Sequence, residues 1–301
     1  MGTPDFAAVT LETLIKSNHE VVAVYTQPDK PFGRKKIIKA SAVKVKAVEE
    51  KIPVYQPNSL KNSEEIENIR NINPDVIVVV AYGQILPKQI LEIPKYGCIN
   101  VHASLLPKYR GASPIQTSIL SGDDVTGVTT MYMSEGLDTG DIIDSVETNI
   151  GENETASELF ERLAPMGATL LEKTLYNIEC GLVTRIPQDE SKASYAPILT
   201  KEMAKINFNM SARCVHKFIC GLSDWPCAYC SLEGKKLKVY RSVLNDEYSG
   251  NPGEILDNKR FIVGCESGAV EFVEVQLEGK KKMLAKDFLN GIGLKKGKKL
   301  N

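Results

Sequence analysis

An amide and an imidazole two residues apart, Asn100 and His102, form the most informative chemical pair in this chain. They end an apolar run that begins at Tyr96 and that predicts a short buried strand leading into a loop. Because successive side chains on a strand point to opposite faces, these two side chains should point the same way. In open α/β sheets ligands bind at the carboxyl edge of the strands. A core histidine bonded to backbone is the alternative for a segment that stands alone.

A carboxylate, Asp138, lies in a loop between two glycines, Glu135–Gly140. Glycines let the backbone turn sharply and come close to a ligand, although an Asp in such a turn is commonly turn chemistry. An amide, an imidazole and a carboxylate on neighbouring strand ends can supply an oxyanion donor, a proton carrier and an orienting anion. None of the three is a strong nucleophile, and no Cys or Ser occupies a recognised elbow. Direct transfer of an acyl group to an incoming nucleophile therefore fits better than a covalent enzyme intermediate.

Strands that alternate with helices must position these groups. Their continuous apolar sequences predict a mostly parallel sheet covered on both faces, an α/β fold. We predict strands at Glu20–Thr26, near Val54, at Asp75–Ala81, Tyr96–His102, Val125–Met133 and Asp141–Thr148. We predict helices from Pro4 to Ser17 and at Ala42–Glu50, Glu64–Asn71, Pro87–Leu91, Pro114–Leu120 and Thr155–Cys180. The polar segment Gln27–Ser41 is predicted to be a loop.

The pattern changes after residue 181. Residues 1–181 are predicted to form the first domain, 182–200 a linker with two prolines, and 201–301 a second domain. In the second domain a helix at Ser211–Leu222 precedes several short strands separated by turn residues, a spacing typical of a small barrel. The chain opens directly at a loop-to-helix start, so we expect that the first strand, central in the common doubly wound order, is missing through truncation or a late start assignment.

The distribution of charge points to a polyanionic partner. The net charge is only −1, but residues 201–301 hold 18 Lys/Arg and 12 Asp/Glu, whereas residues 1–200 hold 19 and 26. A basic island between Gln27 and Lys46 has a single acidic residue, Asp29. Its basic residues are Lys30, Arg34, Lys35, Lys36, Lys39, Lys44 and Lys46. Two basic regions on a nearly neutral protein favour a nucleic acid or similar partner, although a solvated surface is the commoner meaning of any one cluster.

Composition excludes several other classes. No run of about 18 apolar residues could span a membrane, and the N-terminus lacks the apolar core of a signal peptide. Seven scattered cysteines predict reduced thiols and a cytoplasmic protein. Cys227 and Cys230 have the spacing of metal ligands, but no second pair follows, so we expect no metal site. Neither a G-x-G-x-x-G nor a Walker sequence is present.

Five sequence motifs occur in this chain in an order and spacing that match a known family. They are MGTPDFA (1–7), TQPDKPFGR (26–34), AYGQILPK (81–88), GCINVHASLLPKYRGASPIQ (97–116) and EGLDTGD (135–141). Over essentially its whole length the chain closely resembles the methionyl-tRNA formyltransferases. The NVHASLLP and GLDTGD segments are shared by the wider folate-dependent formyltransferase family, whereas TQPDKPFGR, its basic tail and the additional C-terminal domain are specific to the tRNA enzymes.

The resemblance implies a Rossmann-like domain followed by an OB-fold-like domain that binds tRNA. It implies transfer of a formyl group from 10-formyltetrahydrofolate to the α-amine of methionine on initiator tRNA, by a cytoplasmic protein that we expect to be a monomer. Asn100, His102 and Asp138 match the catalytic positions. The residues that match folate-contacting positions are Ser104, Leu105, Leu106 and Pro107 in one segment and Tyr82, Gly83, Gln84 and Ile85 in another. Arg34, Lys35, Lys36 and Lys39 match the loop that grips the acceptor stem of the tRNA.

Three other functions remain open at this point. A folate-dependent formyltransferase acting on a glycinamide nucleotide or an amino sugar could have almost the same core. A non-catalytic RNA-binding protein could retain that core, and its mark would be the absence of folate binding. A hydrolase would release formate without tRNA.

Overall fold

The chain folds into two compact units in the computed structural model, which describes residues 1–32 and 37–301. The first unit comprises Met1–Gly111, Gly127–Thr148 and Phe160–Tyr195, and the second comprises Ala112–Thr126, Asn149–Leu159 and Ala196–Asn301. This division differs from the predicted boundaries. Most of the predicted linker clusters with the first unit, while two segments from the predicted first domain cluster with the C-terminal residues.

The first unit is built on a four-stranded sheet of order β5-β6-β8-β9. Its strands are β5 (Ile77–Val79), β6 (Cys98–His102), β8 (Val125–Tyr132) and β9 (Ile142–Asn149). Strand β5 is parallel to β6, but β8 runs antiparallel to β6. The predicted parallel pairing is therefore present between β5 and β6 but not between β6 and β8, and the sheet is mixed. Strand β8 is buried along nearly its whole length, its threonines included, so its residues do not show the alternation of buried and exposed positions that marks many antiparallel strands.

Strands β1 (Val24–Tyr25) and β4 (Val54–Tyr55) form a separate parallel pair. The first two residues of the chain lie between this pair and β5. The backbone of Met1 and Gly2 bridges this pair to β5, because the Gly2 amide donates to the Tyr25 carbonyl and the Val80 amide donates to the Met1 carbonyl. A cavity of about 300 Å³ continues from there, lined among others by residues 20–25 and 75–78. Of the strand predicted at Glu20–Thr26 only Val24–Tyr25 forms, and residues 20–23 line this cavity.

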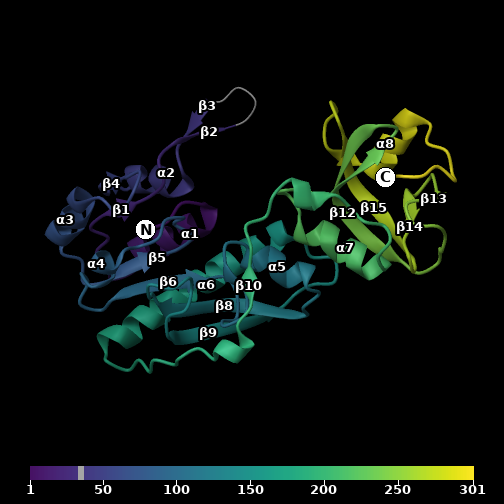
Figure 1. The fold of residues 1–301 in the computed structure, drawn as a ribbon. Helices are drawn as coiled ribbons and strands as arrows, with labels where there is room; N and C mark the ends of the chain where they lie inside the picture. Colours follow the sequence, from purple (N-terminus) through teal and green to yellow (C-terminus); the bar gives the residue numbers. More distant parts are fainter. Residues whose placement is uncertain (33–36) are drawn as a thin grey trace. The chain divides into compact units, whose positions relative to one another are not determined.

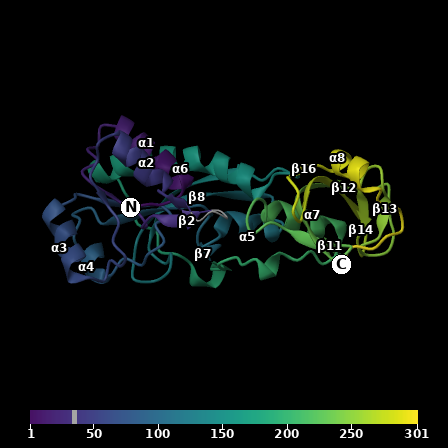
Figure 2. The same ribbon diagram turned by 90° about the horizontal axis from the view of Figure 1, so that it is seen from above.

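Helices flank the sheet of the first unit, as predicted from the 3.6-residue period. They are α1 (Asp5–Lys16), α2 (Ala42–Glu49), α3 (Ser63–Ile72), α4 (Lys88–Leu91) and, from Phe160 onward, α6 (Ala156–Glu179). Helix α6 lies on the same side of the sheet as α1 (Figure 2). Phe160 of α6 meets Phe6 of α1 edge-to-face at 5.4 Å. Gly167 lets α6 approach the sheet closely, because an added Cβ would lie 3.0 Å from Val101 and 3.2 Å from Val128.

The segment Gln27–Ser41, predicted to be a loop, contains an antiparallel hairpin. Its strands are β2 (Lys30–Phe32) and β3 (Ile37–Lys39), with Lys30 opposite Lys39. The hairpin extends away from the sheet of its own unit (Figure 1). Residues 33–36, which follow β2 in the sequence, lie outside the described part of the chain.

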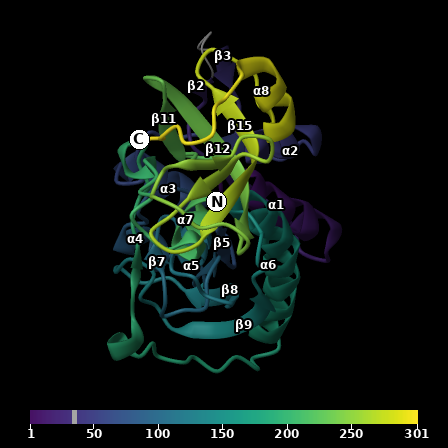
Figure 3. The same cartoon turned by 90° about the vertical axis from the view of Figure 1, so that its right-hand side faces the viewer.

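The second unit contains a sheet of order β11-β12-β15-β14-β13, with β16 added beside β15; all the pairs whose register is known are antiparallel. Its strands are β11 (Tyr229–Leu232), β12 (Lys235–Asn245), β13 (Ile255–Asp257), β14 (Ile262–Gly264), β15 (Ala269–Leu277) and β16 (Met283–Leu284). Its helices are α5 (Pro114–Leu120), α7 (Ala212–Gly221) and α8 (Ala285–Ile292). The two long strands β12 and β15 cross this unit (Figure 3). Helix α7 and a series of short strands were predicted for this part of the chain, whereas helix α8 was not.

A buried histidine in this unit is expected to make the stability of the unit depend on pH. His216 of α7 is fully buried; its Nε2 lies 3.0 Å from the Glu152 carbonyl oxygen and its Nδ1 lies 3.0 Å from Ser242 Oγ. Burial lowers the pKa of His216, and the charges of Lys217 and Arg213 act in the same direction, against the raising effect of Glu152. The folded state therefore keeps this imidazole neutral at a pH where the unfolded chain protonates it.

We expect the free energy of unfolding of the second unit to fall as the pH drops below about 6.5, the ordinary pKa of histidine. His216→Gln should be less stable at neutral pH but should lose less additional stability between pH 7.5 and pH 5.5 than the wild type. Denaturant unfolding at the two pH values measures both effects. An equal loss in both proteins would show that His216 does not contribute to the pH dependence.

Candidate active site

Strand β6 delivers the amide and the imidazole to one face of the sheet. All five of its residues are buried, with Asn100 opposite Met131 and His102 opposite Thr129 on β8. The side chains of Asn100 and His102 are 8% and 6% exposed. His102 is the last residue of β6, so the prediction that the pair lies where this strand ends is confirmed.

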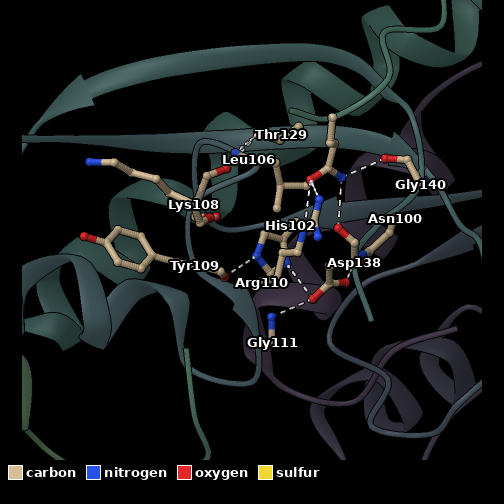
Figure 4. Close-up of polar contacts among 12 residues, drawn as sticks. Asn100, His102, Leu106, Lys108, Tyr109, Arg110, Gly111, Thr129, Asp138 and Gly140 are labelled. Carbon is tan, nitrogen blue, oxygen red and sulfur yellow. Dashed lines mark hydrogen bonds and ion pairs between the residues drawn. The ribbon is translucent and has the colours of Figure 1, made fainter. Parts of the chain in front are cut away.

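The carboxylate of Asp138 meets both side chains. Its Oδ1 accepts a hydrogen bond of 3.2 Å from Asn100 Nδ2, and its Oδ2 lies 3.6 Å from His102 Nδ1 (Figure 4). Oδ2 also accepts a 2.8 Å hydrogen bond from the backbone N–H of Gly111. The structure thus brings together the three side chains that the sequence pattern selected, from two segments 36 residues apart.

The loop that carries Asp138 has an unusual backbone. Asp138 has a φ of +52°, in the left-handed region that few residues other than glycine adopt. Two residues later the chain passes so close to Tyr132 that a Cβ on Gly140 would lie 1.8 Å from its carbonyl oxygen. The loop therefore requires glycine at this position in order to turn the Asp138 carboxylate toward β6.

The hydrogen bonds of His102 fix which nitrogen carries its proton. Nε2 lies 2.9 Å from the Tyr109 carbonyl oxygen, which can only accept, so Nε2 bears hydrogen. Nδ1 is then the nitrogen that can gain or lose a proton, and it is the one that faces Asp138. The backbone contact expected for a core histidine is thus present, and the carboxylate contact is present in addition.

The segment after His102 is held by hydrogen bonds of its own. Ser104 is buried, and its hydroxyl donates to the Lys108 carbonyl at 2.6 Å. Thr129 Oγ1 donates to the Ser104 carbonyl at 2.7 Å and accepts from the Leu106 amide at 3.2 Å. The side chain of Leu106 is buried, whereas Leu105 and Pro107 remain partly exposed. Of the four predicted ligand contacts in this segment, Leu105 and Pro107 are more accessible than Ser104 and Leu106.

The segment after β5 also contains both buried and exposed side chains. Tyr82 is buried in the core, and burial raises the pKa of its hydroxyl to about 12. Gln84 accepts from the Leu60 amide and donates to the Pro57 carbonyl, at 3.1 and 2.9 Å. Ile85, by contrast, is 74% exposed. Since β5 and β6 are parallel neighbours, this segment and the one after His102 leave the sheet at the same edge.

Of the four residues predicted to contact nucleic acid, the structure describes only Lys39. Lys39 lies on β3 and is exposed. Arg34, Lys35 and Lys36 lie outside the described residues. Their role stays a prediction from the sequence.

The described residues show neither a metal-binding cluster nor a membrane-spanning helix. Within the ranges 1–32 and 37–301 no group of three or more His, Cys, Asp or Glu residues could hold a metal ion. Cys227 and Cys230 are buried, and burial raises the pKa of their thiols to about 11 and about 12. No helix within the same ranges is both long enough and apolar enough to cross a bilayer.

Comparison with known sequences decides the family. The Formyl transferase family matches residues 1–175, and the family Formyl transferase, C-terminal domain, matches residues 198–293. The chain belongs to the formyl transferase family. Among its relatives are methionyl-tRNA formyltransferases from Alkaliphilus oremlandii (49% identical over 99% of this chain and 97% of the relative), Clostridioides difficile (47%, 99% and 97%) and Geobacter metallireducens (46%, 100% and 97%).

Solved structures share the fold of this formyl transferase family member. WlaRD, a sugar 3N-formyl transferase, aligns with a TM-score of 0.70 at 22% identity, over 93% of this chain and 97% of its own. An N-formyltransferase from Helicobacter canadensis, in complex with folinic acid and dTDP-3-aminofucose, aligns with a TM-score of 0.69 at 22% identity, over 94% and 97%. At this level of identity the likeness concerns the fold alone.

Two contacts of the site escaped the sequence analysis. The Tyr109 carbonyl and the Gly111 amide hold His102 and Asp138 through backbone atoms. Every residue except proline has both groups, so no residue type marks them. Both residues do lie within the segment that resembles the family, and that resemblance is the only signal that could have indicated them.

Proposed function

We propose that this protein transfers the formyl group of 10-formyltetrahydrofolate to the α-amine of methionine on initiator tRNA. The observation that carries the proposal is similarity of 46–49% identity to methionyl-tRNA formyltransferases along the entire chain, the C-terminal domain included. The cluster of Asn100, His102 and Asp138 supports it, because it offers the donors and the proton carrier that acyl transfer needs. A Rossmann-like first domain and an OB-like, barrel-shaped second domain would follow from the same relationship.

The incoming amine needs little activation. A free α-amine has a pKa of roughly 7.7–8.0, so about a tenth is neutral at pH 7. Its attack on the formyl carbon forms a C–N bond and moves an electron pair onto the formyl oxygen. The site must then stabilise that oxyanion and remove a proton from the new cationic nitrogen. When the oxyanion collapses, the C–N bond to the folate breaks, and the folate nitrogen keeps the electron pair and takes up a proton.

Asn100 is suited to stabilise the oxyanion. Its amide nitrogen has two hydrogens, and one is committed to Asp138 Oδ1. The bond to Asp138 fixes the side chain so that the second hydrogen can donate to a developing negative charge. A donor held in place before the reaction needs no rearrangement during it.

His102 is suited to carry the proton. Nε2 is committed to the Tyr109 carbonyl, which leaves Nδ1 to receive the proton from the amine, directly or through a water molecule. Asp138 Oδ2, 3.6 Å away, would balance the resulting positive charge. Asp138 itself stays in place through the Gly111 amide.

The residues for the formyl donor are those whose surfaces remain accessible at the same sheet edge. Ile85 offers exposed apolar surface and Gly83 an exposed backbone, as a flat heteroaromatic ring such as a pterin requires. Leu105 and Pro107 would contact the ligand from the segment after His102. Tyr82, Gln84, Ser104 and Leu106 would shape the two segments from within.

Parallel assays with several acceptors test the proposal. With 10-formyltetrahydrofolate as donor, we expect formylation of methionyl initiator tRNA and no comparable reaction with a glycinamide nucleotide or an amino sugar. Preferred formylation of either small amine would assign the other kind of formyltransferase. Formate release without tRNA would indicate a hydrolase, and RNA binding without folate binding would indicate a non-catalytic protein. Gel filtration in the same buffer checks the expected monomer, and cell fractionation checks the expected cytoplasmic location.

Salt should weaken the affinity for tRNA steeply, because each phosphate contact releases condensed counterions. Arg34→Ala should lower tRNA affinity and reduce the slope of log affinity against log salt by roughly one contact, while folate binding stays at the wild-type value. Arg70→Ala, at an exposed arginine of α3, serves as the matched control. Affinity independent of salt would assign these charges to solvated surface.

A further inference from the structure

The Asp138 loop is held by a side chain from a segment that the sequence analysis treated as a linker. Gln188 Nε2 donates to two backbone carbonyls of the loop, those of Asp138 at 2.9 Å and Gly140 at 2.7 Å. Gln188 Oε1 accepts from Arg110 Nε at 3.0 Å and from Arg110 Nη2 at 2.8 Å. One half-buried amide thus joins the loop to Arg110 through four hydrogen bonds.

Arg110 in turn is anchored on its other side. Its guanidinium is completely buried and forms a two-pronged ion pair with Glu190, at 2.9 and 2.8 Å. Its backbone amide donates to the Ser194 carbonyl at 2.8 Å. The adjoining residue, Gly111, donates its amide to the Asp138 carboxylate. The same stretch therefore holds Asp138 twice, by the carboxylate directly and by the backbone through Gln188.

The chemistry of the neighbours fixes the orientation of the Gln188 amide. A guanidinium only donates, so it must face the amide oxygen, and the two carbonyls only accept, so they must face the amide nitrogen. Glutamate at this position would have the same shape but would turn a carboxylate oxygen toward two carbonyl oxygens. Methionine would keep the length of the side chain and lose all four bonds.

The loop has reason to need such support. Residues 135–137 are exposed, Asp138 has the strained left-handed backbone, and Arg110, Asp138 and Gly140 converge in one region (Figure 4). Backbone strain of this kind persists only where the surroundings enforce it. A shift of the loop would move the carboxylate relative to His102 Nδ1 and Asn100 Nδ2.

We propose that Gln188 is a positioning residue for the transfer reaction, which acts by holding the backbone of the Asp138 loop so that the carboxylate faces His102 and Asn100. The inference rests on the proposed function. If so, loss of Gln188 lowers kcat because it displaces Asp138. Once Asp138 cannot act, Gln188 should matter little.

A double-mutant cycle tests this coupling. In the wild-type background, Gln188→Met should lower kcat for formylation of methionyl initiator tRNA by about 10- to 100-fold, the range for a small misplacement of a catalytic group, with the KM for tRNA near the wild-type value. In an Asp138→Asn background, the same exchange should cost less than about threefold, since contacting groups are non-additive. Gln188→Glu should be at least as impaired as Gln188→Met. Gln89→Met, the same exchange at an exposed position of α4, should leave kcat unchanged.

The outcomes are distinguishable from failure of the proposed function. If the wild type does not formylate the tRNA, the proposed function is wrong. If the wild type is active and Gln188→Met has the same kcat, or loses the same factor in both backgrounds, the positioning role is overturned. Circular dichroism and folate binding identify any variant that fails to fold. Gln188→Asn keeps the amide on a shorter side chain, so its kcat should be higher than that of Gln188→Met. An equally low kcat in both variants would count against the proposal.

Discussion

Replacing His102 by alanine is expected to lower the rate of formyl transfer by roughly 10²–10⁴, the range for loss of a group that handles a proton in the transition state. The reason is geometric. Nε2 is committed to the Tyr109 carbonyl and Nδ1 faces Asp138, so this imidazole has one nitrogen left for the proton of the amine. A single-turnover measurement with saturating donor and charged tRNA isolates the chemical step from product release.

The control for this variant is His19→Ala, which removes a histidine that takes no part in the Asp138 cluster and should leave the rate unchanged. Folate binding by His102→Ala should persist, which shows that the site is still folded. A near-normal single-turnover rate in His102→Ala would remove His102 from the mechanism and would leave it as a buried histidine bonded to backbone.

Replacing Asn100 by alanine is expected to lower kcat by about 10²–10³, the cost of one preorganised donor to an oxyanion. Asn100 is 8% exposed and is oriented by Asp138, so its remaining N–H is fixed before substrate arrives. Because the oxyanion exists only during reaction, the KM values for folate and tRNA should change little.

The separate changes in kcat and KM distinguish the possible roles of Asn100. If Asn100→Ala raises KM and leaves kcat unchanged, the residue serves ground-state binding instead. Asn100→Asp is a useful companion, because it keeps the shape of the side chain but places a carboxylate beside that of Asp138. It should be at least as impaired as the alanine variant.

Local sequence patterns predicted the elements that carry the site. Strand β6, which carries Asn100 and His102, is a buried run, and helices α6 and α7 begin at recognisable caps. Thr155 and Glu158, for instance, exchange hydrogen bonds at the start of α6. The juxtaposition of Asn100 and His102 follows from the two-residue period of a strand. Asp138 could be grouped with them because its loop follows a predicted neighbouring strand, and the family resemblance then matched all three residues to catalytic positions.

The failures have identifiable causes. The β2–β3 hairpin is polar and contains proline and glycine, so its residues carry a loop signature. The direction of β8 could not be predicted from its residues, because a strand that is buried along most of its length lacks the buried-exposed alternation whichever way it runs. Helix α8 is short and holds both Asn290 and Gly291, which are poor helix formers. Gln188 was missed because it lies in an irregular segment, where only coordinates bring its amide to the Asp138 loop.

The central claim is a direct transfer of the formyl group between two substrates, with no covalent stage on the protein. A rapid-quench single turnover with donor labelled in the formyl carbon tests it most directly. The label should move from folate to methionyl initiator tRNA with matching rates of loss and gain, and acid-precipitated protein should hold none of it. Label that collects on the protein before it reaches the tRNA, or that leaves as formate when tRNA is absent, would contradict the claim.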